Sequence, residues 1–145
     1  MDHNLASSLP ESNIALKNLL DEVRACRHCE ADLPLGPNPV LRVSASARLL
    51  IVGQAPGTKV HASGIPWDDA SGERLRRWLA MDRELFYDES QIGIVPMGFC
   101  YPGKGKSGDL PPAPDCAPKW HQQLLDQMPD VRRVLLVGSY AQKYY

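Results

Sequence analysis

Two continuous aliphatic runs, each ending in glycine, constrain the fold of this chain more than any other feature. They are A-R-L-L-I-V-G at residues 47–53 and V-R-R-V-L-L-V-G at residues 131–138. Runs without polar alternation are typical of strands that are buried on both faces, as in parallel sheets. A shorter run, I-G-I-V-P at residues 92–96, predicts another strand between them in the chain.

Segments with helical periodicity separate these strands. One of them, S-G-E-R-L-R-R-W-L-A, is expected to place Leu75, Trp78 and Leu79 on its inner face. Strands that alternate with helices indicate an α/β fold, here a three-layer α/β/α sandwich around a short central parallel sheet. We expect helices over residues 12–25, 71–80 and 116–128 and from residue 139, and Gly/Pro-rich loops over residues 54–70 and 97–114.

Length and composition indicate one domain. The chain has 145 residues, of which 1–11 are expected to form a flexible tail and 12–145 the folded domain. The formal net charge of −1 gives no general electrostatic argument for a nucleic-acid partner. The start lacks a signal-peptide pattern, and no apolar run approaches the ~20 residues of a membrane helix. We therefore expect a cytoplasmic monomer with no membrane partner.

The loops after the predicted strands are the places to look for a site, because parallel α/β sheets bind ligands at the carboxyl ends of their strands. These loops begin at Gln54, Met97 and Ser139. The first opens with G-Q-A-P-G, residues 53–57, which predicts a sharp turn whose amides point into the crevice. It matches neither G-x-x-x-x-G-K-S/T nor G-x-G-x-x-G, so it is either an anion-binding loop or a tight turn without chemistry.

Four cysteines form a second pattern. Cys26 and Cys29 make a C-x-x-C pair, and Cys100 and Cys116 follow more than seventy residues later. Disulfides are rare in the cytoplasm, so the pattern favours a metal over unrelated thiols. A redox C-x-x-C normally opens a helix after a strand, whereas this pair follows a helix. Four thiolates suit either an iron–sulfur cluster or structural zinc.

Together these motifs resemble the uracil-DNA glycosylase superfamily, most closely its iron–sulfur branch (family 4). The resemblance covers residues 14–145 and rests on ordered features: C-R-H-C, L-L-I-V-G-Q-A-P-G at 49–57, G-I-P-W at 64–67, and two last cysteines sixteen positions apart. It implies that Cys26, Cys29, Cys100 and Cys116 hold a 4Fe–4S cluster, with zinc as the alternative. It also implies a C-terminal truncation, because family members continue to a further strand and an H-P-S-type loop.

The resemblance implies roles for individual residues. Trp67 stands where the family has a phenylalanine that stacks on the flipped base, although a tryptophan packed in a loop core is an equal alternative. Gln54 stands where the family has the glutamate of G-E-A/G-P-G, and Ala55 where the branch with G-Q-D-P-Y-H has its aspartate, so these are the catalytic positions. Lys104 and Lys106 are expected phosphate contacts, Lys59 and Arg74 are further candidates, and solvated surface charge is the alternative for each. The expected base-binding residues are Gly53, Pro56, Gly57, Trp67, Met97 and Phe99.

Other residues depart from the family or have local roles. Pro96 stands where the family has an asparagine that recognises uracil, which leaves the base specificity open. His121 is expected on the surface or at a helix cap, and His61 on the surface. Asp68 and Asp69 are expected to cap the helix that begins near Ser71, with a carboxylate role near the pocket as the alternative.

The function that the resemblance implies is base-excision repair of DNA. The protein is expected to hydrolyse the N-glycosidic bond of uracil or another deaminated base that has been flipped out of the DNA. One alternative is a nucleic-acid-binding homologue that has lost the chemistry, since neither family acid is present. Another is an enzyme that processes nucleotides or small molecules on the same fold.

Overall fold

The computed structural model describes residues 11–145, so the expected tail at residues 1–11 lies almost entirely outside the described part. A parallel sheet forms the centre of the fold. Strand β1 (Leu49–Val52) lies between β2 (Ile92–Ile94) and β5 (Arg133–Leu136), and both neighbours run parallel to it. The register places Ile51 beside Ile94 on one side and beside Leu135 on the other. The predicted strands are therefore confirmed, each somewhat shorter than its aliphatic run.

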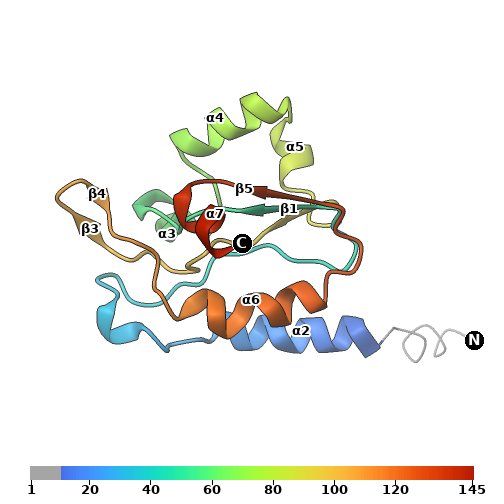
Figure 1. The fold of residues 1–145 in the computed structure, drawn as a ribbon, viewed down its shortest axis with the longest axis horizontal. Helices are drawn as coiled ribbons and strands as arrows, with labels where there is room; N and C mark the ends of the chain where they lie inside the picture. The colour runs from blue at the N-terminus through green and yellow to red at the C-terminus, as the bar shows by residue number, and fades with distance from the viewer. Residues whose placement is uncertain (1–10) are drawn as a thin grey trace, which may run out of the picture.

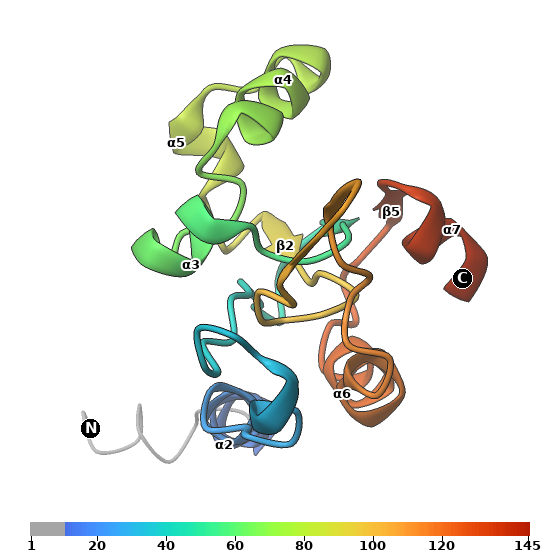
Figure 2. The ribbon, with the colours of Figure 1, turned by 90° about the vertical axis from the view of Figure 1, so that its left-hand side faces the viewer.

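Helices cover both faces of this sheet (Figure 1). Helices α2 (Glu11–Arg24) and α6 (Cys116–Asp126) pack side by side on one face, and α4 (Ala70–Leu79) and α5 (Arg83–Phe86) lie on the other. Figure 2 shows the sheet between these two helical layers, with α7 (Ser139–Tyr144) beside β5. This arrangement confirms the α/β class that was expected from the alternation of strands and helices.

The core divides into two clusters, one on each face of the sheet. Leu50 and Val52 pack with α2 and α6, whereas Ile51 packs with Leu75 of α4 and Phe86 of α5. Successive side chains of a strand point to opposite faces, so a strand between two helical layers needs apolar residues at every position. Residues 50–52 are at most 1% exposed, which accounts for the unbroken run in the sequence.

Several short elements lie in segments for which the sequence predicted no helix or strand. They are η1 (Glu30–Asp32), α3 (Thr58–Ser63), and the hairpin of β3 (Lys104–Gly105) with β4 (Gly108–Asp109). Each is too short to show a hydrophobic period, so pattern analysis has nothing to detect. Helix α5 was also missed, although Asp82 is its N-cap and accepts a hydrogen bond from the Leu85 amide at 2.9 Å.

The inner face of α4 differs from the expectation. Trp78 is 73% exposed, whereas Arg76 is only 5% exposed and takes an inner position beside Leu75. The Arg76 guanidinium donates hydrogen bonds to the Trp67 carbonyl at 3.0 Å and to the Tyr87 hydroxyl at 3.1 Å. It also lies over the Phe86 ring, 5.1 Å from the ring centroid. The expected inner position of Trp78 was wrong. Arg76 is buried instead, with two hydrogen-bond acceptors and an aromatic ring around its guanidinium.

Within residues 11–145, no helix is both long enough and apolar enough to cross a membrane.

Replacing Arg76 with leucine tests whether this buried guanidinium holds the fold. The change leaves the Trp67 carbonyl without its donor, so we expect the free energy of unfolding to fall by about 1.5–3 kcal/mol. Urea denaturation followed by tryptophan fluorescence measures this difference. The control is Arg77→Leu, an exposed position on the same helix, which should change stability by less than ~0.5 kcal/mol. Equal losses in the two variants would show that Arg76 has no special role.

Candidate functional site

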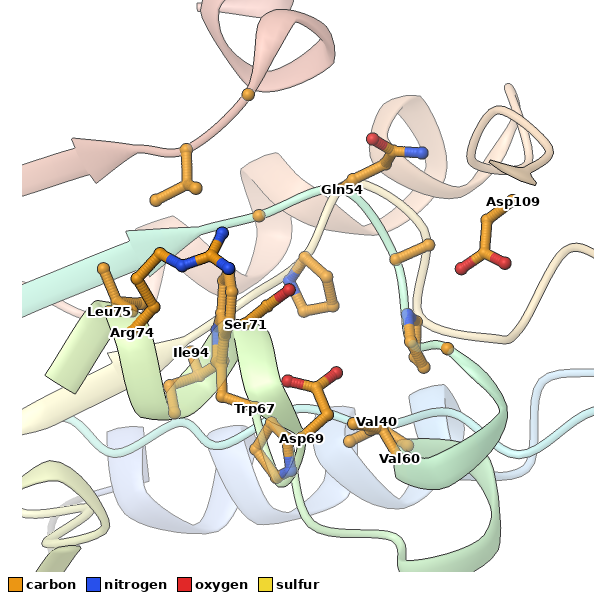
Figure 3. Close-up of a pocket in the computed structure, with 18 of the residues that line it drawn as sticks. Val40, Gln54, Val60, Trp67, Asp69, Ser71, Arg74, Leu75, Ile94 and Asp109 are labelled. Atoms are coloured by element: carbon orange, nitrogen blue, oxygen red, sulfur yellow. The ribbon is translucent and has the colours of Figure 1, made fainter. Parts of the chain in front are cut away.

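A cavity of about 550 Å³ opens at the carboxyl ends of the three parallel strands (Figure 3). It takes residues from the loop after β1, from Pro96 after β2 and from Gly138 after β5. This is the edge of the sheet at which the sequence predicted a site. The cavity is lined by residues Val40, Gly53, Gln54, Ala55, Pro56, Gly57, Val60, Pro66, Trp67, Asp69, Ser71, Arg74, Leu75, Trp78, Ile94, Pro96, Ser107, Asp109, Val137 and Gly138.

The turn at residues 53–57 forms one wall of this cavity. The amide of Met97 donates to the Gly53 carbonyl at 2.8 Å, and the amide of Gly98 donates to the Gln54 carbonyl at 3.0 Å. These bonds join the turn after β1 to the loop after β2. Among the described residues, no acceptor is found for the backbone amides of Gln54 and Ala55. The turn is therefore fixed through its carbonyls, and Gln54 and Ala55 line the cavity.

Two glycines leave the space that Trp67 occupies beside the turn. A Cβ atom on Gly53 would lie 2.7 Å from the Trp67 ring, and one on Gly72 would lie 1.7 Å from the Trp67 carbonyl oxygen. Trp67 itself has φ of 60°, a conformation that costs free energy for a residue with a side chain. The bond from Arg76 to its carbonyl fixes this conformation. The ring packs against the cluster around Ile51, as the packing alternative predicted, and it also lines the cavity. Stacking of a base on this ring stays a prediction.

Two carboxylates line the cavity, although positions 54 and 55 carry no acid. Gln54 and Ala55 both line the cavity, and so do Asp69 and Asp109. The two aspartates approach from opposite sides in Figure 3. Asp69 is the N-cap of α4 and accepts a hydrogen bond from the Gly72 amide at 2.9 Å, which confirms its expected capping role. Asp109 lies beside the turn, since a Cβ atom on Gly57 would be 3.6 Å from its Oδ2.

Helix α4 presents a second stripe to the cavity. Ser71, Arg74 and Trp78 all line it, and their spacing of three and four residues places them on one side of the helix. Sequence analysis gave none of them a role in the cavity, and it also missed Asp109. These three side chains show no hydrophobic periodicity that could reveal a functional helix face. The one signal in the sequence is that their helix follows the G-I-P-W motif.

Met97 and Phe99 lie outside the cavity. They are 7% and 1% exposed and belong to the core cluster on the side of α2 and α6. Pro96 is the residue of this segment that faces the cavity. The lysines expected to contact phosphates, Lys104 and Lys106, are exposed on the β3–β4 hairpin, whose residues Ser107 and Asp109 line the cavity.

The two histidines are more enclosed than expected. His121 is only 1% exposed, so a surface or capping role is wrong. Its Nε2–H donates to the Pro96 carbonyl at 2.8 Å, and the Tyr145 hydroxyl donates to its Nδ1. Burial lowers the pKa of His121, while the bond to Pro96 raises it to a lesser extent. His61 is partly exposed, and its Nδ1 is buried without a partner among the described residues.

The four cysteines line a second recess, on the other side of the sheet. Cys26 and Cys29 follow α2, Cys100 lies in the loop after β2, and Cys116 begins α6. The amide of Phe99 donates to the Cys116 sulfur at 3.4 Å. Burial raises the pKa of the Cys116 thiol to about 12 and also raises the pKa values of Cys29 and Cys100. The fold therefore brings together two pairs of thiols that are distant in the sequence.

The donor set of this recess fits a bound metal centre, because four thiols line it together. Within residues 11–145, no three His, Cys, Asp or Glu side chains gather closely enough to hold one ion. Zinc needs every sulfur about 2.3 Å from the same point, whereas a cubane cluster binds each thiolate through a different iron. Trp120 also borders the recess, and its buried indole N–H has no acceptor among the described residues. A sulfur of a cluster is an acceptor of the kind that this N–H lacks.

The comparison with known families identifies the group to which this geometry belongs. The model of the family described as the uracil DNA glycosylase superfamily matches residues 42–145. The chain belongs to the uracil DNA glycosylase superfamily. The match includes the turn at residues 53–57, Trp67, and the later two cysteines, and it begins after Cys26 and Cys29. The superfamily consists in general of glycosylases that hydrolyse N-glycosidic bonds in DNA.

Pro96 forms part of the cavity wall. Proline has no side-chain donor or acceptor, and its carbonyl is taken by His121. His121 in turn stacks on Phe99, with ring centroids 5.7 Å apart, and meets Tyr144 and Tyr145 on its other sides. The loop after β2 is therefore fixed from behind the cavity and offers the ligand an apolar surface at this position.

The buried neutral state of His121 makes a pH-dependent contribution to stability. The folded pKa lies below the unfolded value of ~6.5, so protonation favours the unfolded chain. The contribution is fully present above about pH 6.5 and is lost as pH falls through the lowered folded pKa. We expect the free energy of unfolding to fall less from about pH 7.5 to about pH 5 in His121→Gln than in the unmodified protein. Glutamine keeps a donor for Pro96 but does not titrate, so parallel curves would contradict this account.

Proposed function

We propose that this protein is a monomeric DNA glycosylase that hydrolyses the N-glycosidic bond of uracil or another deaminated base. The observation that carries the proposal is the pairing of an aromatic face with a carboxylate in one cavity. Trp67 and Asp69 are two positions apart in the chain, and both line the cavity at the carboxyl edge of the sheet. Membership of the superfamily supports the reaction class.

The cavity suits a base that has left the DNA stack. Its volume of about 550 Å³ lies within the ~300–1,000 Å³ that small-molecule sites occupy. Flipping a nucleotide costs a few kcal/mol, and least where the base is mismatched, as a deaminated base is. Stacking of the flipped base on Trp67 offsets part of this cost, because base–aromatic stacking is worth about 1–3 kcal/mol.

The residues of the cavity provide what a dissociative hydrolysis needs. As the C1′–N bond breaks, negative charge develops on the base and positive charge on the sugar. The free amides of Gln54 and Ala55 can hold the departing base anion, and the Asp69 carboxylate can stabilise the sugar cation. Asp69 also accepts a proton from the water whose oxygen bonds to C1′. Gln54 has an amide in place of an acid, so its role is to orient this water or the base edge.

Asp69 is preferred over Asp109 because its position is fixed. Its Oδ1 bonds the Gly72 amide at the start of α4, which leaves its other oxygen for the substrate. Asp109 is exposed and lies on a hairpin whose strands have two residues each. A carboxylate that is held in place before the reaction costs less to orient in the transition state.

A second candidate, a nucleic-acid-binding homologue without chemistry, is favoured by the absence of an acid at both Gln54 and Ala55. In that case the cavity would hold a base and Asp69 would serve only as a helix cap. Such a protein would bind DNA that contains a lesion and release it uncleaved.

For the four-cysteine recess we propose a 4Fe–4S cluster bound by Cys26, Cys29, Cys100 and Cys116, with zinc as the alternative. When bound, the cluster supplies a covalent link between the end of α2, the loop after β2 and the start of α6. The recess borders α2 and α6, whereas the cavity borders α4, so the cluster has a structural role in this scheme.

The variant Asp69→Asn tests the catalytic proposal. Asparagine also caps helices well, so the fold is retained while the carboxylate is lost. We expect the rate of base release to fall by about 100-fold or more, the size of a general-base contribution. The assay uses single-turnover cleavage of oligonucleotides that contain uracil, hypoxanthine or xanthine, followed by alkaline scission of the abasic site.

The matched control is Asp68→Asn, whose neighbouring carboxylate lies outside the cavity lining and pairs with Arg83 at 3.3 Å. Its rate should stay within about twofold of the unmodified rate. A large loss in Asp109→Asn with none in Asp69→Asn would transfer the role to Asp109. Tight binding of every substrate with release of no base would favour the second candidate.

Metal content and the visible spectrum test the cluster. Anaerobically purified protein should be brown and contain about four irons per chain, as one such cluster requires. We expect Cys100→Ala to lose this colour and to lower the melting temperature, because the recess then keeps three of its four thiols. About one zinc per chain would select the alternative, and protein that binds neither metal would overturn both.

A further inference from the structure

Trp78 is 73% exposed, more than any other large hydrophobic side chain in the part of the chain that the structure describes. It belongs to neither core cluster. Helix α4 packs on the sheet through Leu75 and Leu79 instead, while Arg76 bonds the Trp67 carbonyl. The Trp78 ring therefore contributes little to the packing of α4, although it is the largest side chain on the helix.

The exposed Trp78 ring borders the candidate cavity. It lines the same cavity as Trp67, one helical turn beyond Arg74. Trp67 lies against Gly53, just after β1, whereas Trp78 lies near the C-terminal end of α4 and is largely exposed to solvent. The molecule thus has two indoles along one cavity, one partly packed and one largely exposed.

Exposed cations lie on α4 and on the β3–β4 hairpin, two elements that border the cavity. Arg74 and Arg77 are exposed on α4, and Lys104 and Lys106 are exposed on the β3–β4 hairpin, which contributes Ser107 and Asp109 to the cavity. Within residues 11–145, none of these four cations forms an ion pair. Exposed cations on elements that also present an aromatic face complement a phosphate backbone with free bases, despite the net charge of −1.

We propose that Trp78 is a stacking platform for an unpaired base next to the one in the cavity, with Arg74 and Arg77 holding the adjoining phosphates. The ligand is therefore single-stranded DNA in preference to duplex DNA. In a duplex the faces of each base are already stacked on its neighbours, so an exposed indole gains little from them. The proposal rests on the proposed function only in that the cavity receives a base.

Binding of unmodified DNA tests this platform without any need for catalysis. The probe is a fluorescein-labelled oligo-dT strand of about 12 nucleotides, measured by anisotropy alone and as a duplex with oligo-dA. We expect Trp78→Ala to weaken single-strand binding by about 10-fold and duplex binding by less than about twofold. Trp78→Phe should keep most of the affinity because it keeps an aromatic face.

Two further comparisons separate stacking and charge from general surface effects. Leu35→Ala removes another exposed apolar side chain, 53% exposed and away from the cavity, and should leave binding unchanged. Arg74→Gln and Arg77→Gln should each reduce the salt dependence, expressed as the slope of log affinity against log salt, by about 0.7.

Equal single-strand affinity in the unmodified protein and Trp78→Ala would overturn the platform. Duplex binding as tight as single-strand binding would overturn the strand preference. If binding depends on Trp78 but no base is released from any substrate, the glycosylase proposal fails while the platform stands. If Trp78→Ala alters neither base release nor binding, the glycosylase proposal stands while the platform fails.

Discussion

The hydrogen bond from the buried Arg76 guanidinium to the Trp67 carbonyl is the contact on which the site depends. It fixes a residue with positive φ, and through that residue it joins α4 to the end of β1. The same guanidinium bonds the Tyr87 hydroxyl, which donates to the Pro66 carbonyl at 2.7 Å. One charged group therefore positions the whole segment that carries Trp67 and Asp69, and its burial is tolerated because each of these partners is in place.

Much of the fold could be predicted from the sequence because its central strand is enclosed. Ile51 and Val52 are fully buried on opposite faces, so the aliphatic run that encodes them has no polar interruption. The orientation of α4 could not be predicted in the same way. Arg76 is inward only because Tyr87 and Phe86, on a later helix, receive it, and no local period records a partner that is distant in the chain.

The candidate site could likewise be predicted from the sequence only in part. The turn at residues 53–57 and Trp67 were found because loops at the carboxyl ends of parallel strands form ligand sites and because their motifs are specific. Met97 and Phe99 were misplaced because the segment after β2 turns them toward the core. The polar lining from Ser71, Arg74 and Asp109 depends on how α4 and the hairpin fold around the cavity, which spacing along the sequence does not reveal.

The close approach of Trp67 to two glycines also limits how this site can evolve. A methyl group at Gly53 meets the indole ring, and one at Gly72 meets the backbone of the same residue. The ring could yield to the first by becoming smaller, but no side-chain change at position 67 relieves the second. Positions 53 and 67 can therefore vary as a pair, whereas glycine at position 72 is required by any residue that shares this backbone path. Substitutions at positions 53 and 67 can therefore change the width of the cavity, whereas the contact between this segment and the start of α4 has to be kept.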